Sequence, residues 1–189
     1  MRSNDTLLDL LLETQALDRV PRFGYLIRGV DNPESVTEHS WHVLFLVWVL
    51  ADHLPDVDRA RALDLAMVHD LAELRLGDLA RTASRYFPPG AKQQAESAAM
   101  TEILAPLPEK THKLLTEYQA SHSREARLVK ACDKLQLMIK VAVYESWGAT
   151  GMTRFWDNPD NFFDGGFDLV RQLYEELKAR RDASDLNLA

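Results

Sequence analysis

Apolar side chains recur three and four positions apart along most of this chain, which is the spacing that lines one face of an α-helix. The first such segment carries Leu7, Leu8, Leu11 and Leu12 and stops before Pro21. No segment shows the strict alternation of apolar and polar residues that marks a half-buried β-strand. The sequence therefore predicts an all-α fold in which the helices pack as a compact bundle.

Capping and helix-breaking residues divide the chain into successive predicted helices. Ser35 or Thr37 can cap the second helix, and Gly148 follows the end of the longest one. The third helix is apolar on most of its faces, which is typical of a buried helix. Residues 22–34 include glycines and a proline and are predicted to form a loop. The helices are expected over residues 6–19, 35–54, 58–74, 91–104, 109–119, 124–147 and 167–180.

The composition is that of a globular protein. The chain has 189 residues, of which 46% are hydrophobic and 27% charged, and no repeat or linker divides it, so we expect a single domain over residues 1–189. The longest apolar stretch, residues 41–54, is too short and too polar to cross a bilayer. Asp5 and Asp9 stand where a secretory signal would be apolar, and the single cysteine, Cys132, suits a reducing compartment. We therefore expect a cytoplasmic protein that does not associate with membranes.

The net charge limits the class of binding partner. A formal net charge of −7 argues against a broad nucleic-acid surface, because such surfaces neutralise phosphates with many lysines and arginines. A small phosphorylated substrate is compatible with this charge, since it requires only a metal ion and a few local cations.

Four side chains that can bind a metal stand on three predicted helices. His39 lies near the start of the second, in SVTEHSWHV; His69 and Asp70 lie together in MVHDLAEL on the third; Asp133 lies in RLVKACDKLQLMIKV on the sixth. Neutral imidazoles together with carboxylates suit a divalent ion such as manganese, cobalt, iron or magnesium. Water can take the remaining coordination positions, which favours a catalytic site in which a bound water becomes a better nucleophile.

Each of these residues also has an ordinary structural explanation. A single histidine on a helix is more often packed in the core or exposed than bound to a metal, and Asp133 has Gln136 and Lys140 nearby as pairing partners. The adjacent pair His69 and Asp70 is harder to explain in this way, because it interrupts an apolar run where an unpaired charge is costly to bury. The prediction of a metal site therefore depends on all four residues together.

The order of these motifs resembles that of a known family. The segments ESVTEHSWHV, AMVHDLAELRLGD and EARLVKACDKLQ together resemble the HD-domain phosphohydrolases, and within them the branch of 5′-deoxynucleotidases, over residues 22–145. The resemblance implies an HD-domain helical bundle, a homodimer, and an enzyme that hydrolyses deoxyribonucleoside 5′-monophosphates to nucleoside and phosphate. It also implies one divalent metal ion as cofactor, with Mn, Co or Fe favoured and Mg, Zn or Ni as further candidates.

The resemblance assigns roles to single residues. It implies that the metal ligands are His39, His69, Asp70 and Asp133. Glu73 matches the acidic residue that such enzymes place beside the metal-bound water, and it follows His69 by four positions, which would put both on one side of a helix. Asp78 matches a second catalytic acid, which serves the leaving group or holds the sugar.

The same resemblance places the substrate against the segment before the first histidine ligand. Arg22 matches an arginine that contacts phosphate, and its planar guanidinium suits bidentate phosphate binding. Arg28 is a second candidate for this contact. Phe23 stands where the family often has an aromatic residue, commonly Trp in the bacterial enzymes, and is expected to contact substrate. Thr37 and Glu38 flank the first ligand and are expected to orient the imidazole or water.

Three other functions stay open from the sequence. Some HD proteins bind two metals through two further histidines and act as phosphodiesterases or oxygenases, and His112 and His122 lie in the required interval. A second alternative is hydrolysis of nucleoside triphosphates, although the sequence shows no obvious second group of cations for the outer phosphates. A third is a degenerate HD module that binds nucleotides or other partners without catalysis. His42 and His53 are expected in the core or at the surface.

Overall fold

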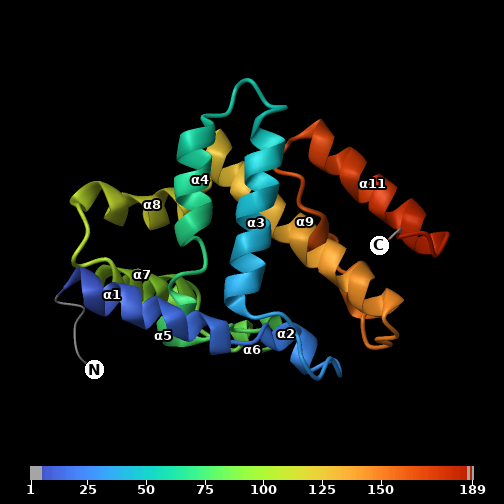
Figure 1. Cartoon of the computed structure of the whole chain (residues 1–189), viewed down its shortest axis with the longest axis horizontal. Coiled ribbons are helices and arrows are strands. Elements are labelled where there is room, and N and C mark those ends of the chain that lie inside the picture. Colours follow the sequence, from blue (N-terminus) through green and yellow to red (C-terminus); the bar gives the residue numbers. More distant parts are fainter. Residues whose placement is uncertain (1–5, 187, 189) are drawn as a thin grey trace.

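The computed structural model describes residues 6–186 and 188, and helices make up most of it (Figure 1). Its longer helices are α1 (Leu7–Thr14), α3 (Val36–Ala51), α4 (Arg59–Val68), α7 (Ala91–Ile103), α8 (Glu109–Ala120), α9 (Arg124–Ser146) and α11 (Asp168–Asp182). Short helical segments are η1 (Gln15–Arg19), α2 (Phe23–Leu26), α5 (Glu73–Leu76), α6 (Arg81–Ser84), α10 (Thr153–Trp156) and η2 (Pro159–Phe162). Within the described residues there is no β-strand, and the only extended pairing is a bridge between Pro21 and Ser35. The all-α prediction is confirmed.

Helix α9 runs through the middle of the molecule and organises the core. Helices α3 and α4 pack against each other and against α9, which passes behind them in Figure 1, while α8 and α11 contact α9 along other parts of its length. Leu65, Leu128 and Leu135 are almost completely buried where these helices meet. Burying a leucine in this way contributes about 1.5–3 kcal/mol. This packing holds α3, the end of α4 and the middle of α9 close together, and these three places carry the predicted metal ligands.

Helix α3 begins at a capping box. The Ser35 hydroxyl accepts a hydrogen bond from the Glu38 backbone N–H (3.2 Å), and the Glu38 carboxylate accepts one from the Ser35 N–H (2.6 Å). Ser35, rather than Thr37, is therefore the cap. The box places His39 in the first turn of the helix. Helix α3 ends at Ala51, three residues before the predicted end at Leu54.

Helix α4 ends earlier than predicted. The prediction of one helix over residues 58–74 is wrong, because α4 stops at Val68 and residues 69–72 form turns before α5. The imidazole Nδ1 of His69 contacts the Ala66 carbonyl oxygen at 2.7 Å, which is the acceptor that the Asp70 N–H would use in a continuing α-helix. Beyond it, N–H groups bond three residues back, as from Glu73 to Asp70 (3.0 Å). The tighter turn therefore gives the side chains of Asp70 and Glu73 directions that differ from those in a continuous α-helix.

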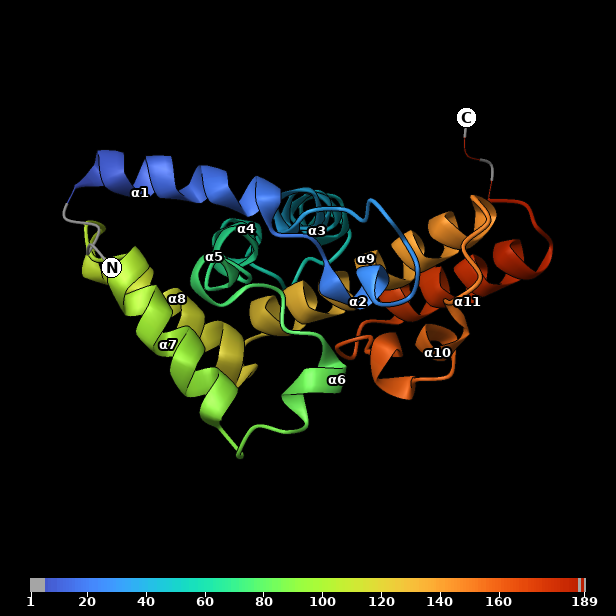
Figure 2. The same cartoon turned by 90° about the horizontal axis from the view of Figure 1, so that it is seen from below.

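The short elements α2, α6, α10 and η2 were not among the predicted helices. Each has only four residues, which is too few to show a 3.6-residue periodicity. Figure 2 shows α2, α6 and α10 on one side of the molecule, where α6 and α10 lie below α9. Across the described part of the chain, no helix combines the length and the hydropathy that a membrane span requires.

Candidate functional site

A cleft of about 970 Å³ opens on this side of the bundle. Residues from α2, the 69–80 segment, α6, α7, α8, α9 and the α10–η2 segment line it. The cleft brings together most of the residues that the sequence singled out. They are Arg22, Arg28, His69, Asp70, Glu73, Asp78 and Asp133.

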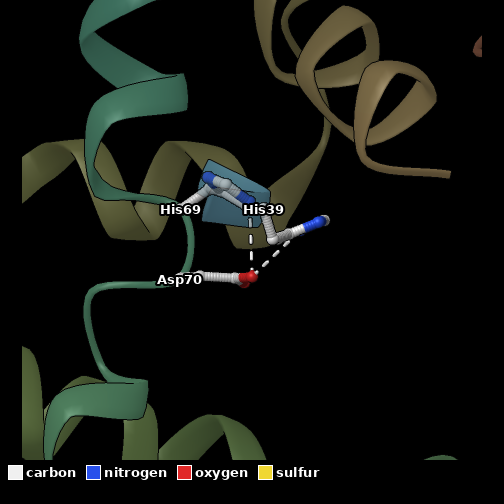
Figure 3. Close-up of side chains that lie close together, drawn as sticks. All are labelled: His39, His69 and Asp70. Atoms are coloured by element: carbon white, nitrogen blue, oxygen red, sulfur yellow. Dashed lines mark ion pairs between the residues drawn. The ribbon is translucent and has the colours of Figure 1, made fainter. Parts of the chain in front are cut away.

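His39, His69 and Asp70 form a compact cluster (Figure 3). The Asp70 Oδ2 atom lies 3.3 Å from His39 Nε2 and 3.4 Å from His69 Nε2. One potential ligand atom from each residue lies within 4.8 Å of the other two. His39 is fully buried and His69 nearly so. Side chains from α3 and from the end of α4 therefore converge on one point.

The nitrogens facing this point lack hydrogen-bond partners. Among the described residues, Nε2 of His39 and Nε2 of His69 are buried polar atoms with no hydrogen bond. The opposite nitrogen of His69 contacts the Ala66 carbonyl, which can only accept, so Nδ1 carries the proton and Nε2 presents its lone pair. Two buried lone pairs beside a carboxylate are costly without a cation between them. The donor set thus fits a divalent metal ion.

Asp133 lies at the edge of this cluster. Its Oδ1 is 3.3 Å from His39 Nε2, and its Oδ2 is 3.1 Å from the Lys134 ammonium. Burial would raise the pKa of Asp133, but Lys134 and His39 outweigh burial and hold it well below its ordinary value. Gln136 and Lys140 do not pair with Asp133. Both bind the buried carboxylate of Glu34 instead.

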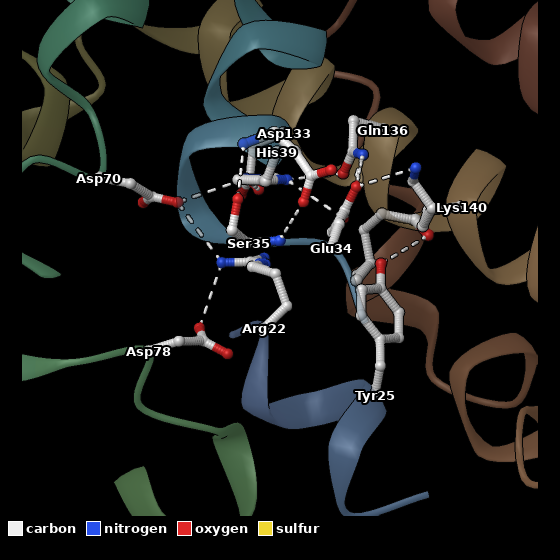
Figure 4. A network of polar contacts seen from close by, with 12 residues as sticks. Arg22, Tyr25, Glu34, Ser35, His39, Asp70, Asp78, Asp133, Gln136 and Lys140 are labelled. Carbon is white, nitrogen blue, oxygen red and sulfur yellow. Dashed lines mark hydrogen bonds and ion pairs between the residues drawn. The ribbon is translucent and has the colours of Figure 1, made fainter. Parts of the chain in front are cut away.

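Arg22 lies close to three carboxylates, and Figure 4 shows it with two of them, Asp70 and Asp78. Its Nη1 lies 3.1 Å from Asp78 Oδ1, 3.4 Å from Asp70 Oδ2 and 3.9 Å from Glu73 Oε2. Burial lowers the pKa of Arg22, but these carboxylates outweigh burial and raise it above its ordinary value. The guanidinium is therefore a permanent charge fixed at the edge of the candidate metal site.

Glu73 reaches the site from α5 rather than from an extended α4. The prediction that it shares a helix face with His69 is wrong, because the turn at residues 69–72 separates them. Its Oε2 is buried and has no hydrogen-bond partner among the described residues. Burial, with the Asp70 carboxylate beside it, raises the pKa of Glu73 to about 10. Glu73 is accordingly able to hold a proton near neutral pH.

Asp78 uses both of its carboxylate oxygens as acceptors. Oδ1 faces Arg22, and Oδ2 accepts a hydrogen bond from the backbone N–H of Phe23 (2.5 Å). Donors of the protein thus engage both oxygens of this carboxylate. Its position suits holding Arg22, or accepting a hydrogen bond from the sugar, better than protonating a leaving group.

Phe23 does not line the cleft. Its ring is 43% exposed, and only its backbone N–H reaches the site. The substrate contact expected from this ring therefore stays a prediction, which the lining of the cleft does not support. Arg28 does line the cleft, where its guanidinium donates to the Gly24 carbonyl (2.7 Å) and lies 4.5 Å from the centre of the Phe155 ring.

The remaining histidines lie outside the cleft. None of those at positions 42, 53, 112 and 122 lines it, and the His112 Nε2 is 3.2 Å from the Leu107 carbonyl. Within the described residues, the cluster at His39 is the one group with metal-ligand geometry. The two-metal alternative therefore finds no support in the geometry of His112 and His122.

Sequence reasoning missed several cations of the cleft. The sequence shows no obvious second group of cations, but the fold brings further cations to the lining of the cleft, namely Arg81, Lys92, Lys130, Lys134 and Arg154. They come from α6, α7, α9 and α10, so their sequence positions show no cluster. Lys134 could have been noticed, because it directly follows Asp133.

Comparison with known proteins identifies the family. The HD domain family model matches residues 14–157. The mouse 5′-deoxynucleotidase HDDC2 is 34% identical over 174 residues, covering 89% of this chain and 84% of that protein, and the human protein of the same name is 32% identical over 185 residues, covering 95% and 88%. A solved structure of a conserved hypothetical protein from Pyrococcus furiosus superposes with a TM-score of 0.78 at 35% identity, covering 93% of this chain and 99% of that one. The chain described here belongs to the HD-domain family.

Proposed function

We propose that this protein is a metal-dependent phosphomonoesterase that hydrolyses deoxyribonucleoside 5′-monophosphates to nucleoside and phosphate. The observation that carries the proposal is the pair of buried, unpartnered Nε2 atoms that converge on Asp70 beside Arg22. The 5′-deoxynucleotidase names of the mouse and human relatives support the substrate class. All four ligand residues are present at an open cleft, which argues against a degenerate HD module that binds nucleotides without catalysis.

We assign the metal to His39, His69, Asp70 and Asp133, in a single site and within a single HD domain formed by residues 1–189. Mn, Co or Fe is the favoured ion, and Mg, Zn or Ni is an alternative, because this mixed nitrogen and oxygen donor set accepts all of them. A bound divalent ion would polarise a phosphoryl oxygen and lower the pKa of a coordinated water. Leu10 of α1 and Tyr174 of α11 belong to the same hydrophobic core, which supports a single domain.

The protein side chains supply the rest of the reaction. Arg22 lies beside Asp70 and Lys134 lies beside Asp133, and both neutralise the phosphoryl oxygens. The charge of a divalent ion held beside it would offset burial and the Asp70 carboxylate and leave Glu73 ionised. Glu73 then takes one proton from the attacking water as the new P–O bond forms and the bond from phosphorus to the 5′ oxygen breaks. That proton passes to the leaving 5′ oxygen, which departs as the nucleoside hydroxyl. Asp78 holds Arg22 in place.

Phosphate release from a panel of nucleotides tests this function. The panel contains deoxyribo- and ribonucleoside 5′-monophosphates and the corresponding triphosphates, each assayed with Mn²⁺ or Co²⁺, and the Asp70→Ala variant serves as control. Release from deoxy monophosphates that disappears in the control supports the proposal. Release from triphosphates alone would instead favour triphosphate hydrolysis, for which the additional cations of the cleft provide a physical basis. No release from any monophosphate would refute it.

We also propose that the protein is a homodimer joined through the α3–α4 aromatic face, defined as Trp41, Phe45, Trp48 and Met67. These side chains are between 47% and 63% exposed, and successive rings stack with centroids 5.5 and 5.9 Å apart. Together they expose on the order of 400 Å² of apolar surface, near the upper end for a monomer and about half of one partner's share in a standard interface. In a two-fold symmetric dimer, this face would pack against the same face of a second copy of the chain.

A further inference from the structure

The two histidines of the candidate metal site are oriented by different means. His69 Nδ1 contacts a backbone carbonyl, that of Ala66, whereas His39 Nδ1 contacts the side-chain oxygen Oε1 of Gln136 at 2.6 Å. A backbone carbonyl can only accept a hydrogen bond, but a glutamine amide can turn either its oxygen or its nitrogen toward a neighbour. The tautomer of His39 therefore depends on what fixes the amide of Gln136.

Glu34 fixes that amide. The Gln136 Nε2 atom donates to both carboxylate oxygens of Glu34, at 2.9 and 3.2 Å. The Lys140 ammonium, which can only donate, lies 3.2 Å from Glu34 Oε2, so donors face both oxygens of this carboxylate. Turning the amide over would place its carbonyl against a buried carboxylate. Gln136 must therefore point its oxygen at His39, as Figure 4 shows.

Glu34 is itself held in place by its backbone. Its N–H donates to the hydroxyl oxygen of Tyr144 (2.7 Å), and its carbonyl accepts a hydrogen bond from the Arg22 N–H (2.9 Å). Glu34, Gln136 and His39 are all at most 5% exposed, so water does not compete for these contacts. The chain of contacts thus runs from a fixed backbone position to the imidazole.

We propose that Glu34 and Gln136 are positioning residues that hold His39 as the Nδ1–H tautomer and so leave its Nε2 lone pair free for the metal. This inference rests on the proposed metal site and extends it to two residues that contact neither metal nor substrate. Losing such an outer partner typically weakens metal binding about 10- to 100-fold. Because His69 has a backbone partner, the effect acts through His39 alone.

A matched pair of variants at Gln136 provides the first test. Gln136→Met keeps the length of the side chain but removes the acceptor, whereas Gln136→Glu keeps an acceptor and can share a proton with Glu34. Each metal-free variant is titrated with Co²⁺ and followed by its visible absorption, which reports the ligand environment directly. We expect the Met variant to bind Co²⁺ about 10- to 100-fold more weakly with an altered spectrum, and the Glu variant to stay within about threefold of wild type.

A second pair keeps the proposal testable if Gln136→Met does not fold. Glu34→Gln retains an acceptor for the Gln136 amide, whereas Glu34→Met removes it and allows the amide to turn its nitrogen toward His39. We expect Co²⁺ affinity to fall in Glu34→Met and to be largely kept in Glu34→Gln. Circular dichroism of the metal-free variants establishes which of them are folded.

The outcomes separate this inference from the proposed function. Equal Co²⁺ affinity in wild type and in a folded Met variant at either position would overturn the positioning role, even if the wild type hydrolyses deoxynucleoside monophosphates. Equal loss in both members of a pair would also overturn it, because the acceptor would then not matter. Wild-type protein that binds Co²⁺ but releases no phosphate would refute the function and leave the positioning role standing.

Discussion

His39 Nε2 and Asp70 Oδ2 lie 3.3 Å apart although 31 positions separate them in sequence, and no hydrogen bond joins the two atoms. The contact links the first turn of α3 to the turn that follows α4. Both groups are held by their own neighbours, Gln136 for the histidine and Arg22 for the aspartate. A cation between them would cross-link the helices that carry them.

Metal removal should therefore lower thermal stability. A ligand that binds only the folded state stabilises by about 2.7 kcal/mol at a hundred times its dissociation constant, which corresponds to roughly 5–10 °C for a chain of this size. Melting curves of protein treated with EDTA, then supplied with Mn²⁺, measure this difference. Asp70→Asn should melt at one temperature in both conditions. A chelator-insensitive wild type that still binds Mn²⁺ tightly would contradict the cross-link.

Glu73→Gln should remove most of the activity while leaving substrate binding nearly unchanged. The amide cannot accept a proton from water, so kcat should fall at least about 100-fold while KM and metal affinity change little. Glu102→Gln is a matched control, since Glu102 is an exposed carboxylate that pairs with Arg75 outside the cleft. Steady-state kinetics at saturating metal measure kcat and KM. A kcat near the wild-type value would show that Glu73 takes no part in the chemical step.

Lys134→Gln should mainly weaken substrate binding. The ammonium lies beside Asp133 at the mouth of the candidate metal site and would contact a phosphate in both the ground state and the transition state. We expect KM for a deoxynucleoside monophosphate to rise about tenfold with a smaller change in kcat. Lys113→Gln, which removes an exposed lysine on α8, should leave both constants unchanged. A wild-type KM in Lys134→Gln would exclude the phosphate contact.

The ion pair of Arg61 and Glu117 should make stability depend on pH. Hydrogen bonds from Arg61, and from the Ser123 hydroxyl, hold the pKa of Glu117 below its ordinary value despite partial burial. This stabilisation is fully present at neutral pH and is lost as the pH falls through the lowered pKa of the folded state. Glu117→Gln should cost about 0.5–1 kcal/mol at pH 7.5, and the difference from wild type should vanish in acid. Urea unfolding of both proteins from pH 7.5 to pH 3 measures this difference in the free energy of unfolding. A difference that stays constant over this range would contradict the prediction.

A charge on the α3–α4 aromatic face should separate the proposed dimer. Phe45→Glu places a carboxylate in the centre of this face, and a two-fold axis brings two of them together, so the variant should be monomeric and remain folded. Tyr86→Glu is the control, because Tyr86 is a highly exposed aromatic residue in the loop before α7. Light scattering after gel filtration gives the mass. A monomeric wild type, or a dimeric Phe45→Glu, would rule out this interface.

The helical architecture and the set of converging residues could be predicted because their signals are local. Periodic leucines define α1, Ser35 and Glu38 form a capping box three residues apart, and the pair His69 and Asp70 interrupts an apolar run. Such features depend on neighbours within a few positions, so a single sequence contains them. The family resemblance then connected His39, His69, Asp70 and Asp133 across three helices.

Only the tertiary structure decided which side chains are partners. Gln136 and Lys140 bind Glu34 rather than Asp133. Lys134 lines the cleft, whereas Phe23 does not. These outcomes depend on how α9 is rotated against α3 and on the turn that ends α4, and both are set by core packing between distant segments. A sequence specifies which faces of its helices are apolar, but the contacts across those faces arise only when the helices are packed together.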